Sequence, residues 1–559
     1  MIDIPRDDTI NTSTTVASSP HHLSQVPTAV DLVAYGKESA KSVNDPPMGS
    51  KDAVEDDLWK PPQSGAQVKL SQKRKWFLLL IFSVAQYLDV CSISGLFVLT
   101  DSIQESLSIR YEVSSWIVTS YSVTFASFLL FFGRLSDLYS AKQVFAYGFF
   151  GVGVLNLIIS FMPNQYAYFV FRALSGIAGA ATIPSAFRLI LAIFEPKELS
   201  IALTLFGLSG ALANATGLII AGLFGFITAG GQQADWRWFF RMIAIMIVPF
   251  ASLALVLIPK TAGDLANQFS ARDKLKRFDI IGCLMMLSSI ILLILGITLG
   301  ASYGWKTAKF LVPFLLSWPI FVAFFFYEAK LAEGFALIPP SFWRIPNMTL
   351  LMVFALGIYP WWCVNQLPLV ERFIGYFHEP AIIAAVRVLP QAVSALAAAF
   401  VIPPLLQKLG NARIPLAGGM FIGAAMYLLL IYSEGEIYHN AYWRWLFPAF
   451  VVGSGAAMMS FLGTNITVMT SVPPEISGVA GAMLQVALQV GAAISLTIQA
   501  GLLTLHPGGI NNYSNIQASL WFQFGWLLLN MLIVIFFFRS SKIPNSAADQ
   551  EGEGAAFGV

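Results

Sequence analysis

Residues 76–99 read WFLLLIFSVAQYLDVCSISGLFVL, an apolar run interrupted near its middle by one carboxylate, Asp89. An α-helix needs about 20 predominantly apolar residues to cross a hydrocarbon core of about 30 Å. The run is long enough to do so. It therefore predicts a membrane-spanning helix with an ionisable group inside the bilayer.

The same pattern recurs along the rest of the chain, with short polar breaks between the apolar stretches. Fourteen spanning helices are predicted in all, at residues 76–99, 113–133, 143–162, 166–190, 200–226, 237–258, 279–300, 309–327, 347–370, 381–406, 414–433, 443–467, 477–504 and 519–538.

Composition agrees with a membrane protein. The 559 residues are 56% hydrophobic and 11% charged, against about 25% charged in an average soluble domain, and the mean hydropathy is +0.68. A net charge of +2 gives no reason to expect a nucleic-acid partner. Cys91, Cys283 and Cys363 lie scattered in apolar segments, which favours neither a disulfide framework nor a metal site. The fold class is an all-α polytopic membrane protein, and no cofactor or metal is expected.

The two ends of the chain differ from the apolar region between them. Residues 1–70 are rich in Ser, Thr, Pro and charge, and residues 541–559 resemble them, so both are predicted to be disordered tails. The chain does not start with a basic stretch followed by an apolar stretch, so no cleaved signal peptide is expected.

The distribution of Lys and Arg orients the predicted helices. An even number of spans puts both tails on one side of the membrane. With that side inside, eighteen Lys and Arg from Lys69 onward flank inner loops and seven flank outer loops. Because Lys and Arg are enriched on the cytoplasmic side, both termini are predicted to be cytoplasmic. The sequon that begins at Asn512 then falls outside, where glycosylation is expected.

Two ionisable groups lie inside predicted spans and need an explanation. A charged group at mid-membrane costs about 2.5 to 3.5 kcal/mol on insertion scales, so such groups are candidates for function. Asp89 has no basic residue within a helical turn and is predicted to accept and release a proton. Arg172 cannot shed its proton and must find a carboxylate, carbonyl or water inside the helices. Each could instead serve only in helix packing.

Uncharged polar and aromatic side chains also lie within the spans. They are candidates to line a substrate cavity, although such groups also hydrogen-bond between helices as structural contacts. The candidates are Gln86, Asn214, Trp361, Trp362, Asn365, Gln366, Asn465, Gln485 and Gln489, and Gln499 is a further amide within a span.

Small residues recur through the fourth and fifth spans. Their spacing lets helix backbones approach closely, as two rocking halves or any tight bundle would require. The glycines predicted to serve in helix packing are Gly176, Gly207, Gly210, Gly217 and Gly222.

The loop after the second span carries a recognisable motif. It reads GRLSDLYSAK from Gly133 to Lys142, and it resembles the loop signature of the major facilitator superfamily. Gly133, Asp137 and Lys142 stand where that signature has Gly, Asp and a basic residue. The resemblance implies that Asp137 pairs with Arg134 or Lys142 and holds one conformation of a transporter.

Arg172 followed by Gly176 resembles the superfamily's fourth-helix motif. Leu88-Asp89 and Asp235-Trp236-Arg237-Trp238 resemble motifs of its fourteen-span drug:proton antiporter branch, and within that branch the chain is most similar to the fungal aminotriazole-resistance and boron-exporter-like members. The resemblance implies two six-helix bundles, at residues 71–260 and 346–540, with two inserted helices between them at residues 261–345.

The branch's fifth-span motif departs at one place. It ends Gly-Pro-x-x-Gly-Gly in the branch but reads Gly217-Leu218-Ile-Ile-Ala-Gly222 here, which leaves the direction of transport open.

The function expected from the resemblance is a secondary active transporter of a small molecule, not an enzyme. A proton-coupled exporter of the multidrug or toxic-compound type, working by alternating access around Asp89 and Arg172, is favoured. A proton-independent facilitator, an uptake carrier and a non-transporting membrane sensor are the alternatives. The absence of a Walker-type motif disfavours a primary pump. The expected partners are lipid, protons and substrate, the expected state is a monomer, and the plasma membrane is favoured over the vacuolar membrane.

Overall fold

Helices make up nearly all of the chain that the computed structural model describes, which is residues 70–110, 113–114, 116–259, 271–332, 335–409, 411–472 and 477–539. These residues belong to one unit, Pro61–Val559. Apart from Leu70, the two predicted tails lie outside the described residues.

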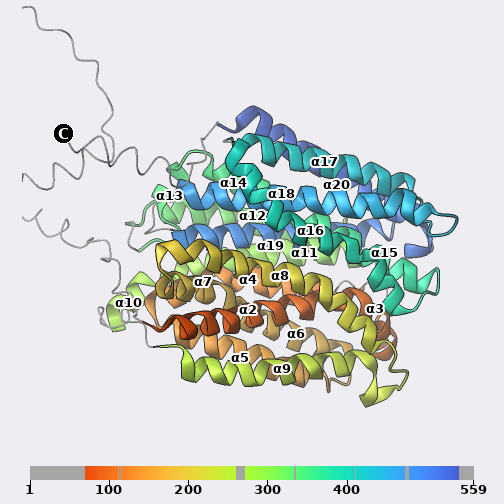
Figure 1. The fold of residues 1–559 in the computed structure, drawn as a ribbon, viewed down its shortest axis with the longest axis horizontal. Coiled ribbons are helices and arrows are strands. Elements are labelled where there is room, and N and C mark those ends of the chain that lie inside the picture. The colour runs from red at the N-terminus through yellow and green to blue at the C-terminus, as the bar shows by residue number, and fades with distance from the viewer. Residues whose placement is uncertain are drawn as a thin grey trace, which may run out of the picture. The chain divides into compact units, whose positions relative to one another are not determined.

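The helices run side by side along one common direction (Figure 1). In chain order they are α2 Gln72–Ser94, α3 Leu96–Ser106, α4 Trp116–Leu138, α5 Ala141–Ile159, α6 Gln165–Ala180, α7 Thr182–Ile193, α8 Pro196–Phe224, α9 Asp235–Leu257, α10 Ala271–Arg277, α11 Ile280–Tyr303, α12 Ala308–Glu328, α13 Pro340–Arg344, α14 Met348–Ala355, α15 Pro360–Gly375, α16 Ala381–Leu409, α17 Arg413–Tyr432, η5 Tyr442–Leu446, α18 Phe447–Ser471, α19 Ser477–Leu502 and α20 Tyr513–Phe537, with the short 3₁₀ turns η3 Gly231–Gln233 and η7 Gly509–Asn511.

Fourteen helical segments of the described residues are long and apolar enough to cross a membrane. The prediction of an all-α protein with fourteen spanning helices is confirmed, and most boundaries differ from it by a few residues. The largest differences are at the fourteenth span, which begins at Tyr513 rather than 519, and the ninth, which ends at Gly375 rather than 370. The predicted first span is also divided at Gly95 into α2 and α3.

Helical geometry satisfies the backbone of each span internally, which a bilayer without water requires. Side chains close several helix starts. Asn164 accepts a hydrogen bond from the Ala167 amide at 3.0 Å, and Asp279 accepts one from the Gly282 amide at 3.1 Å. Asn512 caps α20 by accepting from the Ser514 amide at 3.2 Å.

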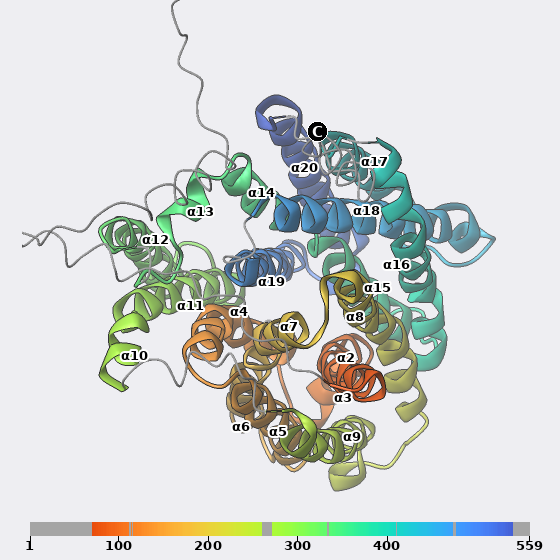
Figure 2. The same cartoon turned by 60° about the vertical axis from the view of Figure 1, so that its left-hand side comes forward.

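Burial separates central helices from peripheral ones (Figure 2). The spans built on α4, on α6 with α7, on α14 with α15, and on α19 are each 61% buried, whereas α12 is only 11% buried. The segment α12 packs mainly on α11, and α11 in turn contacts α4 and α19. The most buried spans carry Arg172, Gln366 and Gln499.

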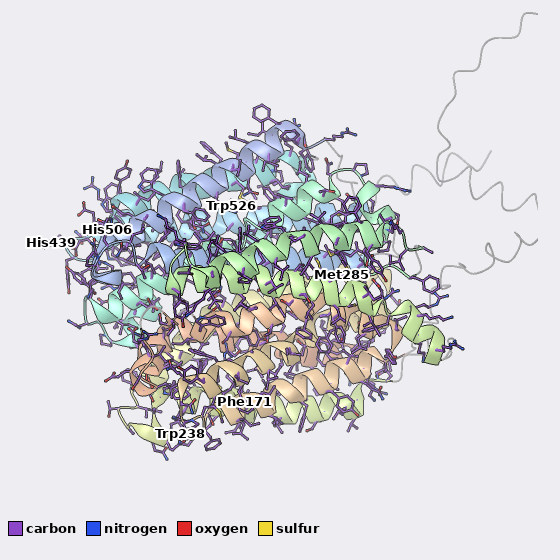
Figure 3. All side chains as sticks on the ribbon, turned by 180° about the vertical axis from the view of Figure 1, so that it is seen from behind. Phe171, Trp238, Met285, His439, His506 and Trp526 are labelled. Atoms are coloured by element: carbon purple, nitrogen blue, oxygen red, sulfur yellow. The ribbon has the colours of Figure 1, made fainter. Side chains whose placement is uncertain are left out.

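Polar contacts define the two ends of this helical unit. At one end, Lys75 lies 3.0 Å from Glu195, and Arg74 donates to the Leu257 carbonyl at 2.8 Å. We call this the Lys75 end. At the other end, α3 contacts α15, which carries Glu371, and we call it the Glu371 end. His439 and His506 lie at the Glu371 end (Figure 3).

The helices form two sets of contacts. Within α2–α9, α4 packs on α6, α5 on α9 and α2 on α8, while within α14–α20, α17 packs on α18 and α20. Contacts of α8 with α16 and of α4 with α19 join the sets. The division into two six-helix bundles with an inserted pair remains a prediction, and its proposed boundary at residue 260 lies outside the described residues.

Candidate functional site

Asp89 is enclosed near the C-terminal end of α2, five residues before Ser94. Its side chain is 3% exposed. The hydroxyl of Tyr121, on α4, donates a hydrogen bond to its Oδ1. The carboxylate therefore has one strong donor from a neighbouring helix and almost no contact with solvent.

Arg172, on α6, is fully buried close to Asp89. The three nitrogens of its guanidinium have no hydrogen-bond partner among the described residues. The guanidinium carbon lies 4.8 Å from the centre of the Tyr121 ring and 5.6 Å from that of Phe240. It also interacts electrostatically with Asp89.

Magnitudes show why Arg172 needs Asp89. A desolvated cation on an aromatic ring gains about 2 kcal/mol, while a mid-membrane Arg and a mid-membrane Asp each cost about 2.5 to 3.5 kcal/mol. At best, the two ring contacts offset the cost of placing Arg172 inside the membrane. The cost of placing Asp89 there has to be offset by its attraction to Arg172. Asp89, Tyr121 and Arg172 thus form one charged cluster, which we call the Asp89 cluster.

Two glycines of α6 make room for this cluster. A Cβ at Gly179 would lie 2.2 Å from the Tyr121 hydroxyl and 3.1 Å from Asp89 Oδ1. A Cβ at Gly176 would lie 2.3 Å from Thr124 Oγ1 and 2.4 Å from the Tyr121 carbonyl. Both glycines are therefore needed where α6 meets α4.

The glycines of α8 are less uniform than the sequence suggests. A Cβ at Gly217 would lie 2.2 Å from Ser94 Oγ, and one at Gly222 would lie 2.9 Å from Ile382 Cα on α16. A Cβ at Gly210 would lie 2.9 Å from the Gln86 amide nitrogen. A Cβ at Gly207 would meet nothing within 4 Å, so no close contact supports the packing role predicted for Gly207.

The polar residues predicted to line a cavity do not gather at one point. Gln86 lies against Gly210, and buried oxygens of Gln86 and Asn214 have no hydrogen-bond partner among the described residues. Gln366 is fully buried, and neither its amide oxygen nor its amide nitrogen has a hydrogen-bond partner among the described residues. Asn365 lies beside the Tyr427 hydroxyl.

The two tryptophans of α15 face different neighbours. Trp361 donates to Ser454 Oγ at 3.0 Å and packs 4.7 Å from the Tyr427 ring, inside the α17–α18 side of the protein. Trp362 packs with Leu208 of α8 on a small apolar cluster that includes Ala395 and Met458.

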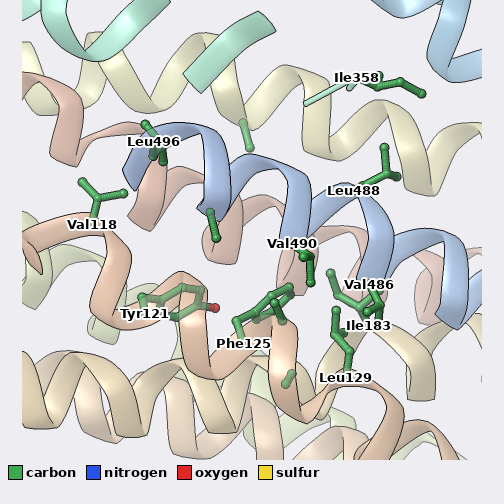
Figure 4. Close-up of a cluster of buried hydrophobic side chains, with 14 of the residues drawn as sticks. Val118, Tyr121, Phe125, Leu129, Ile183, Ile358, Val486, Leu488, Val490 and Leu496 are labelled. Atoms are coloured by element: carbon green, nitrogen blue, oxygen red, sulfur yellow. The ribbon is translucent and has the colours of Figure 1, made fainter. Parts of the chain in front are cut away.

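The remaining predicted cavity residues lie half-buried on α18 and α19. Gln485 interacts with the Tyr359 hydroxyl. The α19 helix, which carries Gln485 and Gln489, packs on α4, and its Val490 is drawn next to Phe125 (Figure 4).

The predicted switch loop is held by backbone carbonyls. Arg134 donates to the Arg277 carbonyl at 3.0 and 2.6 Å, and Arg188 donates to the Ser136 carbonyl. A Cβ at Gly133 would lie 3.8 Å from Ala482 of α19. The side chain of Asp137 lies outside the described residues, and Lys142 is half-buried.

Glu371 is a buried carboxylate that sequence reasoning missed. The predicted ninth span stops at residue 370, but α15 continues to Gly375 and places Glu371, 6% exposed, inside the protein. It lines a cavity of about 30 Å³ together with Thr100, Thr119 and Gln499. Tyr121 and Gly179 were also missed as site residues.

Asn512 lies at the Glu371 end with its side chain already engaged. Its Oδ1 caps α20, and its Nδ2 lies 3.4 Å from the Pro507 carbonyl. Glycosylation there remains a prediction. No group of three or more His, Cys, Asp or Glu among the described residues is placed to hold a metal ion.

Known proteins resemble this chain in sequence. The family model described as the Major Facilitator Superfamily matches residues 78–496. The chain is 25% identical over 461 residues to the multidrug transporter mfsC of Aspergillus fumigatus, covering 81% of this chain and 84% of that protein. It is 25% identical to the efflux pump terJ of Aspergillus terreus, covering 85% and 90%. It is 26% identical to the puromycin resistance protein pur8 of Streptomyces alboniger, covering 79% and 84%.

Solved structures share the fold. A POT family transporter in complex with 5-aminolevulinic acid superposes with a TM-score of 0.61 at 14% identity, covering 86% of this chain and 99% of that one. The nucleoside transporter NupG superposes with a TM-score of 0.55 at 13% identity, covering 83% and 100%. At these identities the likeness concerns the arrangement of helices only.

Proposed function

This chain belongs to the major facilitator superfamily of membrane transporters, and we propose that it is a proton-coupled exporter of a small organic compound. The Asp89 cluster carries the proposal. It places one carboxylate, able to take up and release a proton, beside a guanidinium that stays charged. The proposal includes no catalytic step.

Coupling follows from the competition for the Asp89 carboxylate. When Asp89 is ionised, Tyr121 and Arg172 both favour its charge, and when it is protonated the attraction to Arg172 is lost. A proton therefore changes the forces between α2, α4 and α6. In alternating access, two bundles rock around such a midplane site, and we assign this movement to helices α2–α9 and α14–α20.

Export is supported by the relatives and by the charge of the site. The similar proteins are named as a multidrug transporter, an efflux pump and a resistance protein. Proton entry from outside supplies about 2.3 kcal/mol per 100 mV for each charge that crosses. Because Leu218 stands where the fifth-span motif has Pro, the direction of transport has to be measured.

The orientation belongs to the same proposal. The Lys75 end carries the basic loops and is placed on the cytoplasmic side, with both termini, while the Glu371 end is placed outside. We favour the plasma membrane and a monomer. The amides of α8, α15, α18 and α19 are assigned to substrate contact, on the ground that several of their buried polar atoms have no partner in the described structure.

The decisive experiment combines a growth screen with reconstituted transport. A strain lacking the protein is tested against toxic compounds, including borate and azoles, and the compound that identifies a phenotype is used as the probe in proteoliposomes. An imposed pH gradient should drive the probe across the membrane with the wild type and not with Asp89→Asn. Full gradient-driven transport by Asp89→Asn would refute the coupling. Flux that ignores both the gradient and an uncoupler would indicate a facilitator instead.

A further inference from the structure

Two buried acids meet where α11 begins and α12 ends, outside the Asp89 cluster. Asp279 stands directly before α11, and Glu328 is the last residue of α12. They are 5% and 3% exposed, respectively. Helices α11 and α12 pack along each other, which brings the two acids together. Carboxyl groups buried this deeply need hydrogen-bond partners, because burial removes the water that would otherwise solvate them.

Asp279 has partners for only one of its two carboxyl oxygens. Its Oδ1 accepts hydrogen bonds from the Gly282 amide at 3.1 Å and from the Tyr327 hydroxyl at 3.0 Å. Its Oδ2 is buried and has no hydrogen-bond partner among the described residues. One buried acceptor of the pair is therefore left over.

Glu328 holds the segment that follows α12. Its Oε1 accepts a hydrogen bond from the Leu337 amide at 3.3 Å, and its Oε2 accepts one from the Ile338 amide at 3.1 Å. These two bonds fasten the chain after α12 back onto the last residue of that helix.

The unpartnered oxygen of Asp279 faces Glu328. A Cβ at Gly282 would lie 1.9 Å from Asp279 Oδ2 and 2.6 Å from Glu328 Oε1, so both oxygens border the same small space. The two carboxyl groups lie within hydrogen-bonding range of each other. Because ionised carboxylates can only accept, a hydrogen bond between them requires one proton.

No basic side chain replaces that proton. No ion pair among the described residues involves Asp279 or Glu328. Helix α19, which packs on α11, carries no titratable side chain. Helix α4 brings Arg134, which interacts electrostatically with Cys283 of α11 but donates its hydrogen bonds to the Arg277 carbonyl.

The other bases near this end are engaged elsewhere or face solvent. On α10, Lys274 lies 5.6 Å from the centre of the Tyr139 ring, and Arg277 lies 5.3 Å from that of Phe335. Lys330 and Arg344, which flank the segment after α12, are exposed.

We propose that Asp279 and Glu328 bind one proton between Oδ2 and Oε1, and that this proton clamps the end of α12 to the start of α11. Two ionised carboxylates at close range in a poorly solvated site repel each other, so the pair keeps a proton. The proton belongs to the pair rather than to either residue. It converts the repulsion into a charge-assisted hydrogen bond and satisfies the buried Oδ2.

Loss of the proton would loosen this part of the protein. Repulsion would then move Glu328 away from Asp279 and weaken its hold on the Ile338 amide. Helix α12 packs mainly on α11, and α11 contacts both α4 and α19. The clamp thus makes the attachment of α12 depend on pH. This inference goes beyond the proposed function and depends neither on the compound carried nor on the direction of transport.

Infrared absorption of protonated carboxyl groups tests the shared proton directly. Full-length protein in lipid nanodiscs is measured at pH 6.5, and each variant is compared with the wild type, so that bands from other protonated acids cancel. Glu328→Gln should lose the band of one protonated carboxyl group. Asp279→Asn should lose the same band, because its amide donates to Glu328 and removes the repulsion that kept the proton. The matched control Glu105→Gln removes an exposed acid and should leave the band unchanged.

Amide hydrogen exchange at Ile338, followed by mass spectrometry, tests the clamp. Asp279→Asn suits this test because Asn tolerates the left-handed φ of 47° at this position. Its oxygen can still accept from Gly282, and its amide supplies the missing donor. At pH 9 Ile338 should exchange severalfold more slowly in Asp279→Asn than in the wild type, whereas at pH 6 the two should agree. Glu328→Gln, which also donates to Oδ2, should give the same result if Asp279→Asn folds poorly.

Two results would overturn the proposal. A carboxyl band that persists in Asp279→Asn would show that burial alone keeps Glu328 protonated, without a shared proton. Equal exchange at Ile338 in the wild type and in both variants at pH 9 would show that the proton clamps nothing.

Discussion

At the scale of single residues, Tyr121 decides how Asp89 and Arg172 meet. Its hydroxyl binds the acid and its ring covers the base, so one side chain holds both charges. Arg172 has no hydrogen bond of its own in the described structure. The ion pair between Asp89 and Arg172 is therefore available but not fully formed, which is a useful condition for a group that must alternate between partners.

Removing the Tyr121 hydroxyl should expose this arrangement. A hydrogen bond to a charged group contributes about 1.5 to 3 kcal/mol net, so Tyr121→Phe should lower the transport rate about tenfold or more while the ring still covers Arg172. The matched control is Tyr168→Phe, since the buried Tyr168 hydroxyl has no described hydrogen-bond partner. Initial rates of probe transport in proteoliposomes give the comparison, and equal rates for the two variants would contradict the role of Tyr121.

Asp101 should give the protein a measurable pH dependence of stability. Burial raises the pKa of its carboxyl group from 3.8 to about 6. The folded protein therefore binds a proton that the unfolded chain has already released between these values. This stabilising contribution is complete below the unfolded pKa and is lost as the pH rises through 6.

The expected result is a Tm that falls between pH 5 and pH 7.5 in the wild type and falls less in Asp101→Asn. Glu105→Gln, which removes the exposed acid of the same helix, should follow the wild type. Thermal unfolding in detergent at several pH values measures these slopes. The assignment to Asp101 fails if its variant keeps the full wild-type slope.

At the scale of elements, glycines set how closely the helices approach. Gly179 on α6 leaves space for the Tyr121 hydroxyl, and Gly217 on α8 leaves space for Ser94 on α2. Both stand where a neighbouring helix carries a polar group toward the centre. The small-residue face of a transporter helix therefore has parts that shape the site and parts that face open space.

A pair of alanine substitutions should separate these parts. Gly179→Ala forces a methyl group against the Tyr121 hydroxyl, and overpacking of this kind costs about 1 to 3 kcal/mol. Gly207→Ala meets nothing within 4 Å and should be neutral or stabilising by up to about 1 kcal/mol, because Ala favours a helix more than Gly. A drop in Tm and in transport for Gly207→Ala equal to that for Gly179→Ala would count against this distinction.

At the scale of the whole molecule, the two contact sets touch at both ends. Near the Lys75 end Gly133 of α4 faces Ala482 of α19, and at the Glu371 end α3 meets α15. Alternating access requires these contacts to break in turn. The structure thus offers a position at which one end can be locked.

A disulfide between α4 and α19 should stop transport reversibly. The Cβ positions at Gly133 and Ala482 are 3.8 Å apart, which suits a disulfide. Oxidation of the double variant Gly133→Cys with Ala482→Cys should abolish transport, and a reducing agent should restore it. Each single variant serves as a control. Transport that continues after complete cross-linking would show that this contact need not open.

Hydropathy alone predicted the helices, because length and apolar content are properties of each segment. It could not reveal that Tyr121 lies between Asp89 and Arg172, since that depends on packing among α2, α4 and α6. Glu371 escaped notice for a simpler reason. With Arg372 beside it, it reads as the polar flank of a span, and only the continuation of α15 to Gly375 brings it inside.

The exposed surface of α12 has a consequence for the bilayer around the protein. The apolar part of α12 lies between Lys309 and Glu328, and the helix is only 11% buried, so about 27 Å of it faces the acyl chains, at about 1.5 Å per residue. That length is shorter than the core of a sterol-rich plasma membrane, which is about 32 to 33 Å thick. At the proposed location the bilayer would have to thin locally around α12, at a cost of a fraction of a kcal/mol for each Å of mismatch.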